Sequence, residues 1–214
     1  MERNKVLGAE WSRYKKLREE RPLLFVDNGL IHIVTDENVV ADFQETHNRK
    51  IGVVYESAYN MVLVDLVYEE EGKYFAYERL VPAVESGAVV MIPKYKDKVI
   101  LLNQYRHALR NYQYAFPRGF GEKGLSAEAN CKKELMEEIG ATVVHTEYLG
   151  QVTPDSGVQA TVVSVYACEI SDYDSSLHSE GIKEILEVSE EQVECMIKNG
   201  EITDGFTLAA LMLK

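Results

Sequence analysis

Residues 119–141 read GFGEKGLSAEANCKKELMEEIGA and join a glycine-bearing loop to an amphipathic segment. The loop covers 119–124, and the spacing of apolar residues after it predicts a helix over 126–139. Ser126 is suited to cap the start of this helix, and Gly140 is suited to end it. The sequence therefore predicts a loop that is followed at once by a helix.

Three carboxylates gather at the end of this helix. Glu134, Glu137 and Glu138 stand at relative positions 0, 3 and 4, which places them within an arc of about 100° on one helix face. Like charges at this spacing repel by about 0.2–0.5 kcal/mol per pair. A divalent cation would relieve the repulsion, and oxygen ligands of this kind favour Mg²⁺ or Mn²⁺ over zinc. The alternative is an acidic face that is only solvated.

The segment resembles the Nudix box, whose pattern is G-x5-E-x7-R-E-U-x-E-E-x-G-U with U a bulky aliphatic residue. The matching positions are Gly119, Glu134, Leu135, Glu137, Glu138 and Gly140. Three positions depart from the pattern, namely Leu125 in place of glutamate, Lys133 in place of arginine and Ala141 in place of a larger aliphatic residue. The carboxylates of the pattern are thus present, and the residues expected to brace them are altered.

The order of elements along the chain indicates two domains. A first third rich in predicted strands precedes a mixture of strands and helices, with a boundary near residue 85. The expected strands are 23–26, 30–34, 51–55, 61–68, 74–81, 87–93, 98–103, 143–151, 160–170 and 182–188. This organisation resembles the ADP-ribose pyrophosphatase branch of the Nudix family. The resemblance implies an α/β fold in which 86–214 form the Nudix α/β/α sandwich with a mixed sheet. It also implies that 1–85 form a small β-rich domain for dimerisation and substrate contact.

The resemblance implies hydrolysis of the pyrophosphate bond of a nucleoside diphosphate linked to another group, most readily ADP-ribose or a nucleotide sugar. Glu134, Glu137 and Glu138 would hold Mg²⁺ or Mn²⁺ and act in catalysis, and the backbone carbonyl of Arg118 would complete the coordination. Arg106 and Arg118 are the expected substrate-binding residues. The resemblance also implies a general base on a loop. The loop 171–184 offers Glu180 and Glu184, and Glu180 is preferred because Gly181 follows it as a hinge. A homodimer is also implied.

Two alternatives follow from the altered positions and from the substrate pocket. Lysine is a point charge that holds a carboxylate less rigidly than arginine does, and leucine cannot bind an ion. The first alternative is therefore a catalytically impaired module that binds ADP-ribose or a related nucleotide as a sensor. The second is an enzyme for another substrate, such as NADH, a dinucleoside polyphosphate or a damaged nucleotide. The loop 119–124 also satisfies G-x-G-x-x-G, but no apolar strand precedes it directly, so a dinucleotide-binding fold is rejected.

Composition excludes several classes of protein. The net charge of −12 over 214 residues disfavours a nucleic-acid groove, which needs clustered lysine and arginine. No apolar run approaches the length of a membrane span, and the N-terminus has no signal-peptide core. The three cysteines show no C-x-x-C spacing and are expected to stay reduced. We therefore expect a cytoplasmic protein without a membrane or nucleic-acid partner.

Overall fold

The computed structural model describes residues 7–27, 29–176 and 181–214. Contacts within the chain divide it into two compact units. The first unit comprises the chain through Ala83 together with Asp155–Thr161, and the second comprises Val84–Pro154 and Val162–Lys214. The roles in dimerisation and substrate contact predicted for 1–85 stay predictions.

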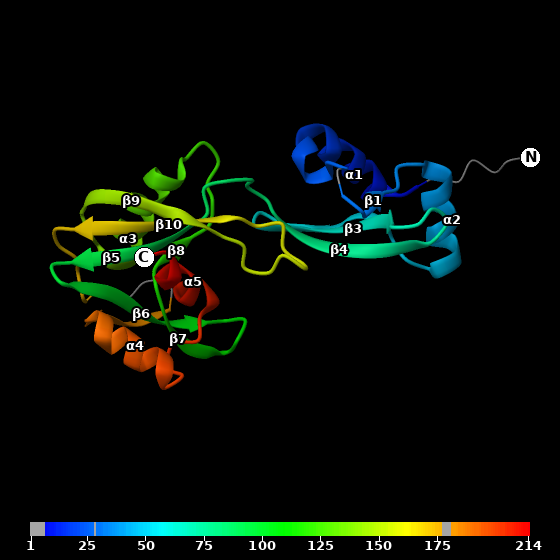
Figure 1. Cartoon of the computed structure of the whole chain (residues 1–214). Coiled ribbons are helices and arrows are strands. Elements are labelled where there is room, and N and C mark those ends of the chain that lie inside the picture. The colour runs from blue at the N-terminus through cyan, green and yellow to red at the C-terminus, as the bar shows by residue number, and fades with distance from the viewer. Residues whose placement is uncertain (1–6, 28, 177–180) are drawn as a thin grey trace, which may run out of the picture. The chain divides into compact units, whose positions relative to one another are not determined.

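The first unit is built on a four-stranded antiparallel sheet (Figure 1). Its central strand β3 pairs with β1, β2 and β4. The elements of this unit are α1 (Ala9–Glu20), a 3₁₀ helix η1 (Pro22–Phe25), β1 (His32–Ile33), α2 (Glu37–His47), β2 (Gly52–Glu56), β3 (Asn60–Tyr68) and β4 (Tyr74–Pro82). Trp11, Tyr14 and Leu17 of α1 are buried in a core that also contains apolar residues of β2, β3 and α2.

Two elements of the first unit differ from expectation. The apolar run predicted as a strand over 23–26 forms η1 instead, with Pro22 in its first turn. Proline fixes φ near the helical value and has no N–H to give to a strand, which favours this start. The second difference is α2, which was not predicted. Asp36 caps it by accepting hydrogen bonds from the backbone N–H groups of Asn38 and Val39.

The segment between β9 and β10 belongs to the first unit by its contacts. Leu80 of β4 receives a backbone hydrogen bond from Ala160 and gives one to Val158, at 2.9 and 2.8 Å. The Tyr77 hydroxyl donates to the carbonyl of Gly157 at 2.6 Å. Asp155 accepts a hydrogen bond from the N–H of Gly157 at 3.0 Å, so this segment begins as the structural turn that its proline and glycine indicate.

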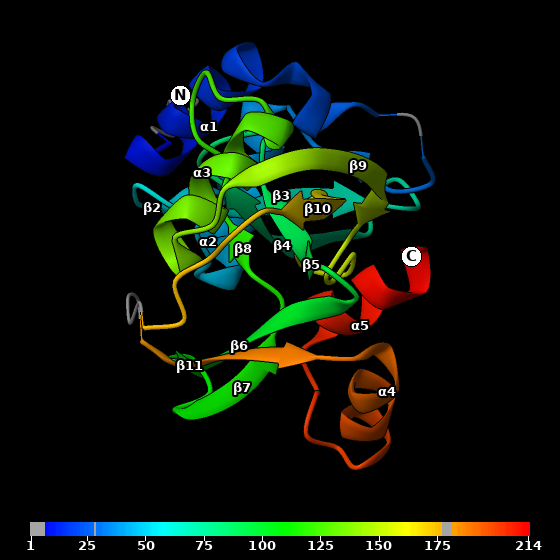
Figure 2. The ribbon, with the colours of Figure 1, turned by 90° about the vertical axis from the view of Figure 1, so that its left-hand side faces the viewer.

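The second unit contains a seven-stranded mixed sheet with the order β11-β6-β5-β10-β9, in which β7 pairs with β6 and β8 with β5 (Figure 2). Strands β5 and β10 are parallel, and the other pairs are antiparallel. Its elements are β5 (Val89–Tyr95), β6 (Lys98–Arg106), β7 (Asn111–Ala115), β8 (Arg118–Gly119), α3 (Ala127–Ile139), β9 (Val143–Val152), β10 (Val163–Ile170), β11 (Ile182–Val188), α4 (Glu190–Lys198) and α5 (Gly205–Leu213).

Helices cover both faces of this sheet. Along β5, Val89 and Met91 belong to a core cluster with α3, whereas Val90 and Ile92 belong to a cluster with α4 and α5. This alternation is the period of two expected for a strand whose two faces are both buried. The predicted α/β/α sandwich with a mixed sheet is therefore confirmed.

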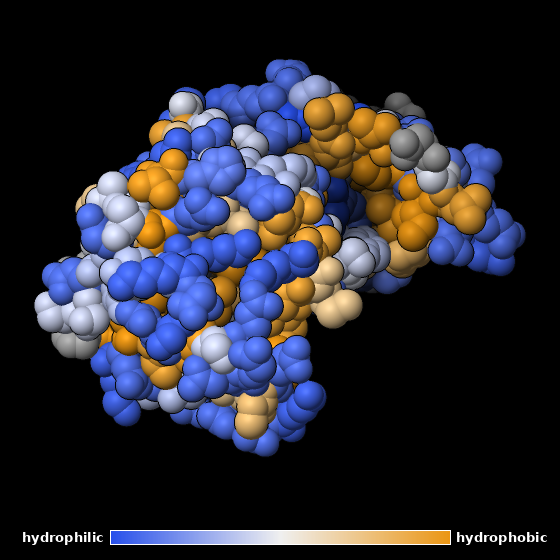
Figure 3. Space-filling view, turned by 60° about the vertical axis from the view of Figure 1, so that its left-hand side comes forward, coloured by the Kyte–Doolittle hydropathy of each residue, from blue (hydrophilic) through white to orange (hydrophobic). Residues whose placement is uncertain are grey.

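Blue, hydrophilic residues cover much of the face seen in Figure 3, with orange, hydrophobic patches between them. In the part of the chain that the structure describes, no helix has both the length and the apolar character needed to cross a membrane.

Candidate active site

The predicted carboxylate helix is present as α3. Its start is capped by the Ser126 hydroxyl, which accepts a hydrogen bond from the N–H of Ala129 at 3.2 Å. Its end is Gly140, which has a left-handed backbone with φ 63° and donates its N–H to the carbonyl of Met136. Glycine adopts this conformation without steric cost, which explains the closing glycine of the sequence pattern. The predicted helix over 126–139 is confirmed.

The three carboxylates of α3 lie in different environments. Glu134 is partly buried and Glu137 is exposed. Glu138 is buried, with 2% of its surface exposed, on the helix face that also buries Leu135 and Ile139. A buried carboxylate costs free energy unless it is paired or bound to a metal ion. Its burial on an apolar helix face shows that this carboxylate is not part of a solvated acidic surface.

Glu134 lies directly against β8. A Cβ atom added to Gly119 would collide with the carboxylate of Glu134, so only glycine leaves room for this side chain. Strand β8 is itself fixed by pairing of Arg118 and Gly119 with Val90 and Val89 of β5. The opening glycine of the pattern thus lets a helix carboxylate reach the backbone at the start of the loop.

Lys133 joins two carboxylates. Its Nζ atom lies 2.6 Å from Oε2 of Glu137 on the same helix and 2.8 Å from Oε1 of Glu122 in the loop. Glu122 first, and Glu137 second, raise the pKa of the Lys133 ammonium above its usual value. The i, i+4 spacing in the sequence is the signal for the contact with Glu137, and the contact with Glu122 has no such signal.

The donor set was tested for its fit to a divalent cation. Three carboxylates on one helix, one beside the backbone of β8 and one buried, are the hard oxygen donors that Mg²⁺ and Mn²⁺ accept. Among residues 7–27, 29–176 and 181–214, however, no three His, Cys, Asp or Glu side chains lie close enough together to hold a metal ion. Glu137 is bound to Lys133 in this arrangement. The chemistry of the site fits a dication, provided that Glu137 turns away from Lys133.

The side chain of Arg118 has a structural partner. Its guanidinium donates to Oδ1 of Asp204 at 3.1 Å and lies 5.0 Å from the centre of the Phe206 ring. The other oxygen of Asp204 caps α5 by accepting from the N–H of Thr207 at 3.0 Å. The Thr207 hydroxyl in turn accepts from the N–H of Phe116 at 2.9 Å. These contacts tie α5 to the chain beside β8, and the substrate and metal roles of Arg118 stay predictions.

Two further site residues were predicted outside α3 and β8. Arg106 is the last residue of β6, and its carbonyl accepts from the N–H of Leu109 in the turn that leads to β7. Its role in substrate binding stays a prediction. Glu180, the predicted general base, and the neighbouring His178 lie outside the described residues.

Asn130 is a residue of this region that the sequence analysis missed. It is fully buried on α3, and its Nδ2 atom donates to the carbonyls of Phe120 and Gly87 at 2.8 and 2.9 Å. It therefore fixes the loop 119–124 to the helix. The only signal in the sequence was a polar residue one position before Cys131 on the apolar face of the predicted helix.

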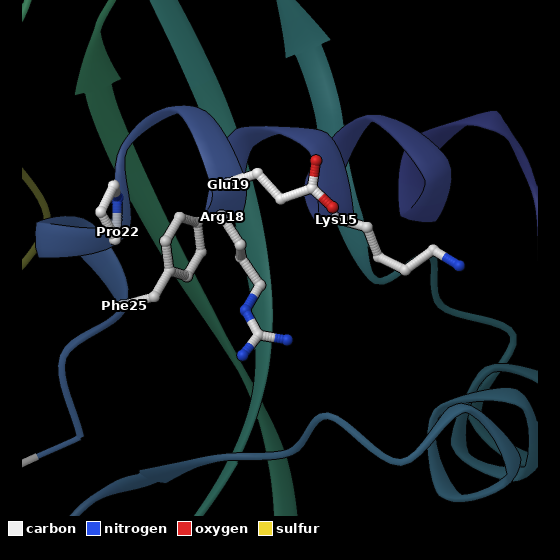
Figure 4. Close-up of a pocket in the computed structure, with 5 residues that line it drawn as sticks. All are labelled: Lys15, Arg18, Glu19, Pro22 and Phe25. Atoms are coloured by element: carbon white, nitrogen blue, oxygen red, sulfur yellow. The ribbon is translucent and has the colours of Figure 1, made fainter.

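A pocket of about 380 Å³ lies in the first unit and not in the carboxylate region (Figure 4). It lies between α1 and η1, and its lining residues are Lys15, Arg18, Glu19, Pro22 and Phe25. None of them is a predicted site residue. We assign the candidate active site from side-chain chemistry and not from this cavity.

Comparison with known proteins places these features in a family. The sequence profile of the NUDIX domain matches residues 84–206, which is more than half of the chain. The ADP compounds hydrolase NudE of Escherichia coli (strain K12) is 32% identical over 77 residues, which cover 36% of this chain and 40% of that protein. The match thus spans well under half the length of this curated relative.

A solved structure shares the fold. The crystal structure of an ADP compounds hydrolase superposes with a TM-score of 0.64 at 19% sequence identity, covering 75% of this chain and 87% of that one. At this identity the likeness concerns the fold. The profile match, which includes every residue of α3 and its preceding loop, shows that the chain belongs to the NUDIX domain family.

Proposed function

We propose that this chain hydrolyses the pyrophosphate bond of a nucleoside diphosphate linked to another group, with Mg²⁺ or Mn²⁺ as cofactor. The substrates that we propose are ADP-ribose and nucleotide sugars. The observation that carries the proposal is the burial of Glu138 one helical turn after Glu134, in the segment that matches the Nudix box. The relative from Escherichia coli, whose name describes a hydrolase of ADP compounds, supports this choice of substrate.

The chemistry follows from the charge of the substrate. A pyrophosphate linkage repels an attacking water, and a bound dication would screen that charge, polarise the phosphoryl oxygens and make the water more acidic. Glu134 and Glu138 would hold the ion from successive turns of α3, with Glu137 beside them. In this proposal Arg106 pairs with a phosphate of the substrate, and the Arg118 carbonyl adds a ligand to the ion.

We also propose a cytoplasmic homodimer in which the first unit forms the dimer contact. The three cysteines are free thiols, which is the usual state in a reducing compartment. The dimer rests on the resemblance to ADP-ribose pyrophosphatases, and its test is the mass of the protein in solution.

The activity is tested by incubating the full chain with ADP-ribose, with and without Mg²⁺, and separating the products by chromatography. We expect release of AMP and a sugar phosphate only in the presence of the ion. Glu137→Gln should reduce the rate by about a hundredfold or more, because loss of outer-shell partners alone costs 10- to 100-fold. Glu128→Gln, which removes an exposed acid of the same helix, should leave the rate nearly unchanged. Equal rates for all three proteins would contradict the proposal.

A nucleotide sensor without turnover is the second candidate. Two observations favour it, the hold of Lys133 on Glu137 and the leucine at position 125. A sensor would bind ADP-ribose in a calorimetric titration and release no AMP after long incubation with Mg²⁺. The double change Leu125→Glu with Lys133→Arg would raise the turnover of a weakened enzyme and leave that of a sensor at zero.

A further inference from the structure

The bridge made by Lys133 joins a loop to a helix. One ammonium group contacts Glu137 of α3 at 2.6 Å and Glu122 of the preceding loop at 2.8 Å. All three side chains are between 36% and 55% exposed, so water can replace any of these contacts. Exposed ion pairs contribute little to stability. The bridge can therefore exchange partners at low cost, which a buried pair could not do.

The position of Glu122 is set by buried contacts. Asn130, which has no exposed surface, holds the carbonyl of Phe120, two residues before Glu122. The chain turns after Glu122, and the Glu122 carbonyl accepts a hydrogen bond from the N–H of Leu125 at 3.1 Å. The loop thus presents the Glu122 carboxylate to Lys133 from a fixed backbone. The side chain of Leu125, at the position of the first glutamate of the family pattern, offers no acceptor to Lys133.

On the basis of the proposed function, we propose that Glu122 is a positioning residue that takes over the Lys133 ammonium when Glu137 turns to the divalent cation. Lys133 and the cation compete for the same carboxylate. With Glu122 present, Lys133 loses one contact and keeps another when the cation binds. In a protein without Glu122, the ammonium would keep neither carboxylate contact of the bridge once Glu137 turned to the cation. Glu122 thus favours cation binding through Lys133, without touching the ion.

A simpler explanation is that Glu122 only adds negative charge near the site. The two explanations differ in their dependence on Lys133. If Glu122 acts through the lysine, its removal has no effect once the lysine is gone. If it acts through charge alone, its removal weakens cation binding equally in both backgrounds. A double-mutant cycle separates the two cases.

The test is calorimetric titration of Mn²⁺ into the full chain and into Glu122→Gln, Lys133→Met and the double variant. We expect Glu122→Gln to weaken Mn²⁺ binding about two- to fivefold, the range that corresponds to an exposed ion pair. Lys133→Met should bind Mn²⁺ more tightly than the natural protein, because a competitor and a positive charge are removed. Adding Glu122→Gln to Lys133→Met should then change nothing.

Glu128→Gln is the matched control. Glu128 is an exposed acid of α3 that contacts Lys132 at 2.9 Å in the same i, i+4 arrangement, outside the bridge. Its loss should leave Mn²⁺ affinity nearly unchanged. An unchanged affinity in Glu122→Gln, or an equal loss in the Lys133→Met background, would overturn the inference while Mn²⁺ binding itself stands. Absence of Mn²⁺ uptake by the natural protein would overturn the proposed cofactor, and this inference with it.

Discussion

Asp65 of the first unit and Glu138 of the second are the two most deeply buried acids among the described residues, each with 2% of its surface exposed. Their surroundings differ. Arg79 donates from Nε and Nη2 to the two oxygens of Asp65, at 2.5 and 3.1 Å, and the buried Tyr14 hydroxyl donates to it as well. Glu138 lies on α3 one turn after Glu134 and next to Glu137, so that three acids gather near the end of one helix.

Asp65 is a structural acid, whereas Glu138 is the acid that we propose as a ligand of the cation. A bidentate arginine neutralises Asp65 inside the fold, so that its charge is used in holding β3 to β4. The acids of α3 concentrate negative charge on one helix. Repulsion between them does not stabilise the fold, and a bound cation would relieve it. Burial alone therefore does not identify a ligand-binding carboxylate, and the gathering of three acids on one helix is what makes α3 a candidate.

The largest effect is expected from breaking the structural pair. Asp65→Asn leaves the Arg79 guanidinium, which is 19% exposed, without its counter-charge, and this should cost about 3–5 kcal/mol of unfolding free energy. Trp11, the only tryptophan of the chain, is buried in the same unit, so its fluorescence reports the loss during denaturant unfolding. The loss should be the same with and without Mg²⁺. A change below about 1 kcal/mol would show that this pair is not what stabilises the sheet.

A change at Glu138 should affect turnover and the stabilisation that Mg²⁺ gives. Glu138→Gln removes a buried carboxylate that we propose as a ligand of the cation. Turnover should fall about a hundredfold or more, equivalent to about 2.7 kcal/mol or more in the activation free energy. The rise in unfolding temperature that Mg²⁺ gives the natural protein should disappear, because a ligand stabilises only the state that binds it. A variant that unfolds without metal but keeps its activity would assign Glu138 to the fold.

The smallest effects should appear with pH, with opposite signs in the two units. Hydrogen bonds from Arg13 lower the pKa of Glu56 and of Glu20, and Lys50 lowers that of Glu10, all from a usual value of 4.5. Stability from these pairs is therefore present above pH 4.5 and is lost as the pH falls through the lowered values. The pKa of Lys133 is raised, so its contribution is complete below its usual value of 10.5 and is lost only as the pH rises through the raised value.

Trp11 fluorescence during acid titration measures the first of these effects. It should report a loosening of the first unit below pH 4.5, because Trp11 lies on α1 beside Arg13. In Arg13→Gln the acid dependence should be weaker. An unchanged profile in this variant would mean that other groups control the acid transition.

The sequence predicted most strands of both units, but it missed α2 of the first unit and β7 and β8 of the second. Helix α3 has clear caps, and strands β5 and β6 have clear apolar patterns. All three elements lie within a few residues of their predicted bounds. Helix α2 was missed although Asp36 and the spacing of Val39, Val40 and Phe43 are signals for it. The attachment of 155–161 to β4 had no signal, because it depends on backbone hydrogen bonds between residues about 80 positions apart.

In the candidate site as well, contacts within one helix were predictable and contacts between distant segments were not. The common face of Glu134, Glu137 and Glu138 and the contact of Lys133 with Glu137 follow from helical spacing alone. The contact of Lys133 with Glu122 depends on the path of the loop, which the buried amide of Asn130 fixes. The partner of the Arg118 side chain, Asp204, lies 86 positions away and could be read only as a helix cap. Local periodicity predicts which side chains share a face, and long-range packing decides what they contact.

The most direct test is a crystal structure with Mn²⁺, using anomalous scattering to locate the ion. We predict a peak beside α3, within about 2.0–2.3 Å of carboxylate oxygens of Glu134 and Glu138, with Glu137 turned away from Lys133. A peak elsewhere in the molecule, or none beside α3 at saturating Mn²⁺, would contradict the assignment of this helix as the metal site.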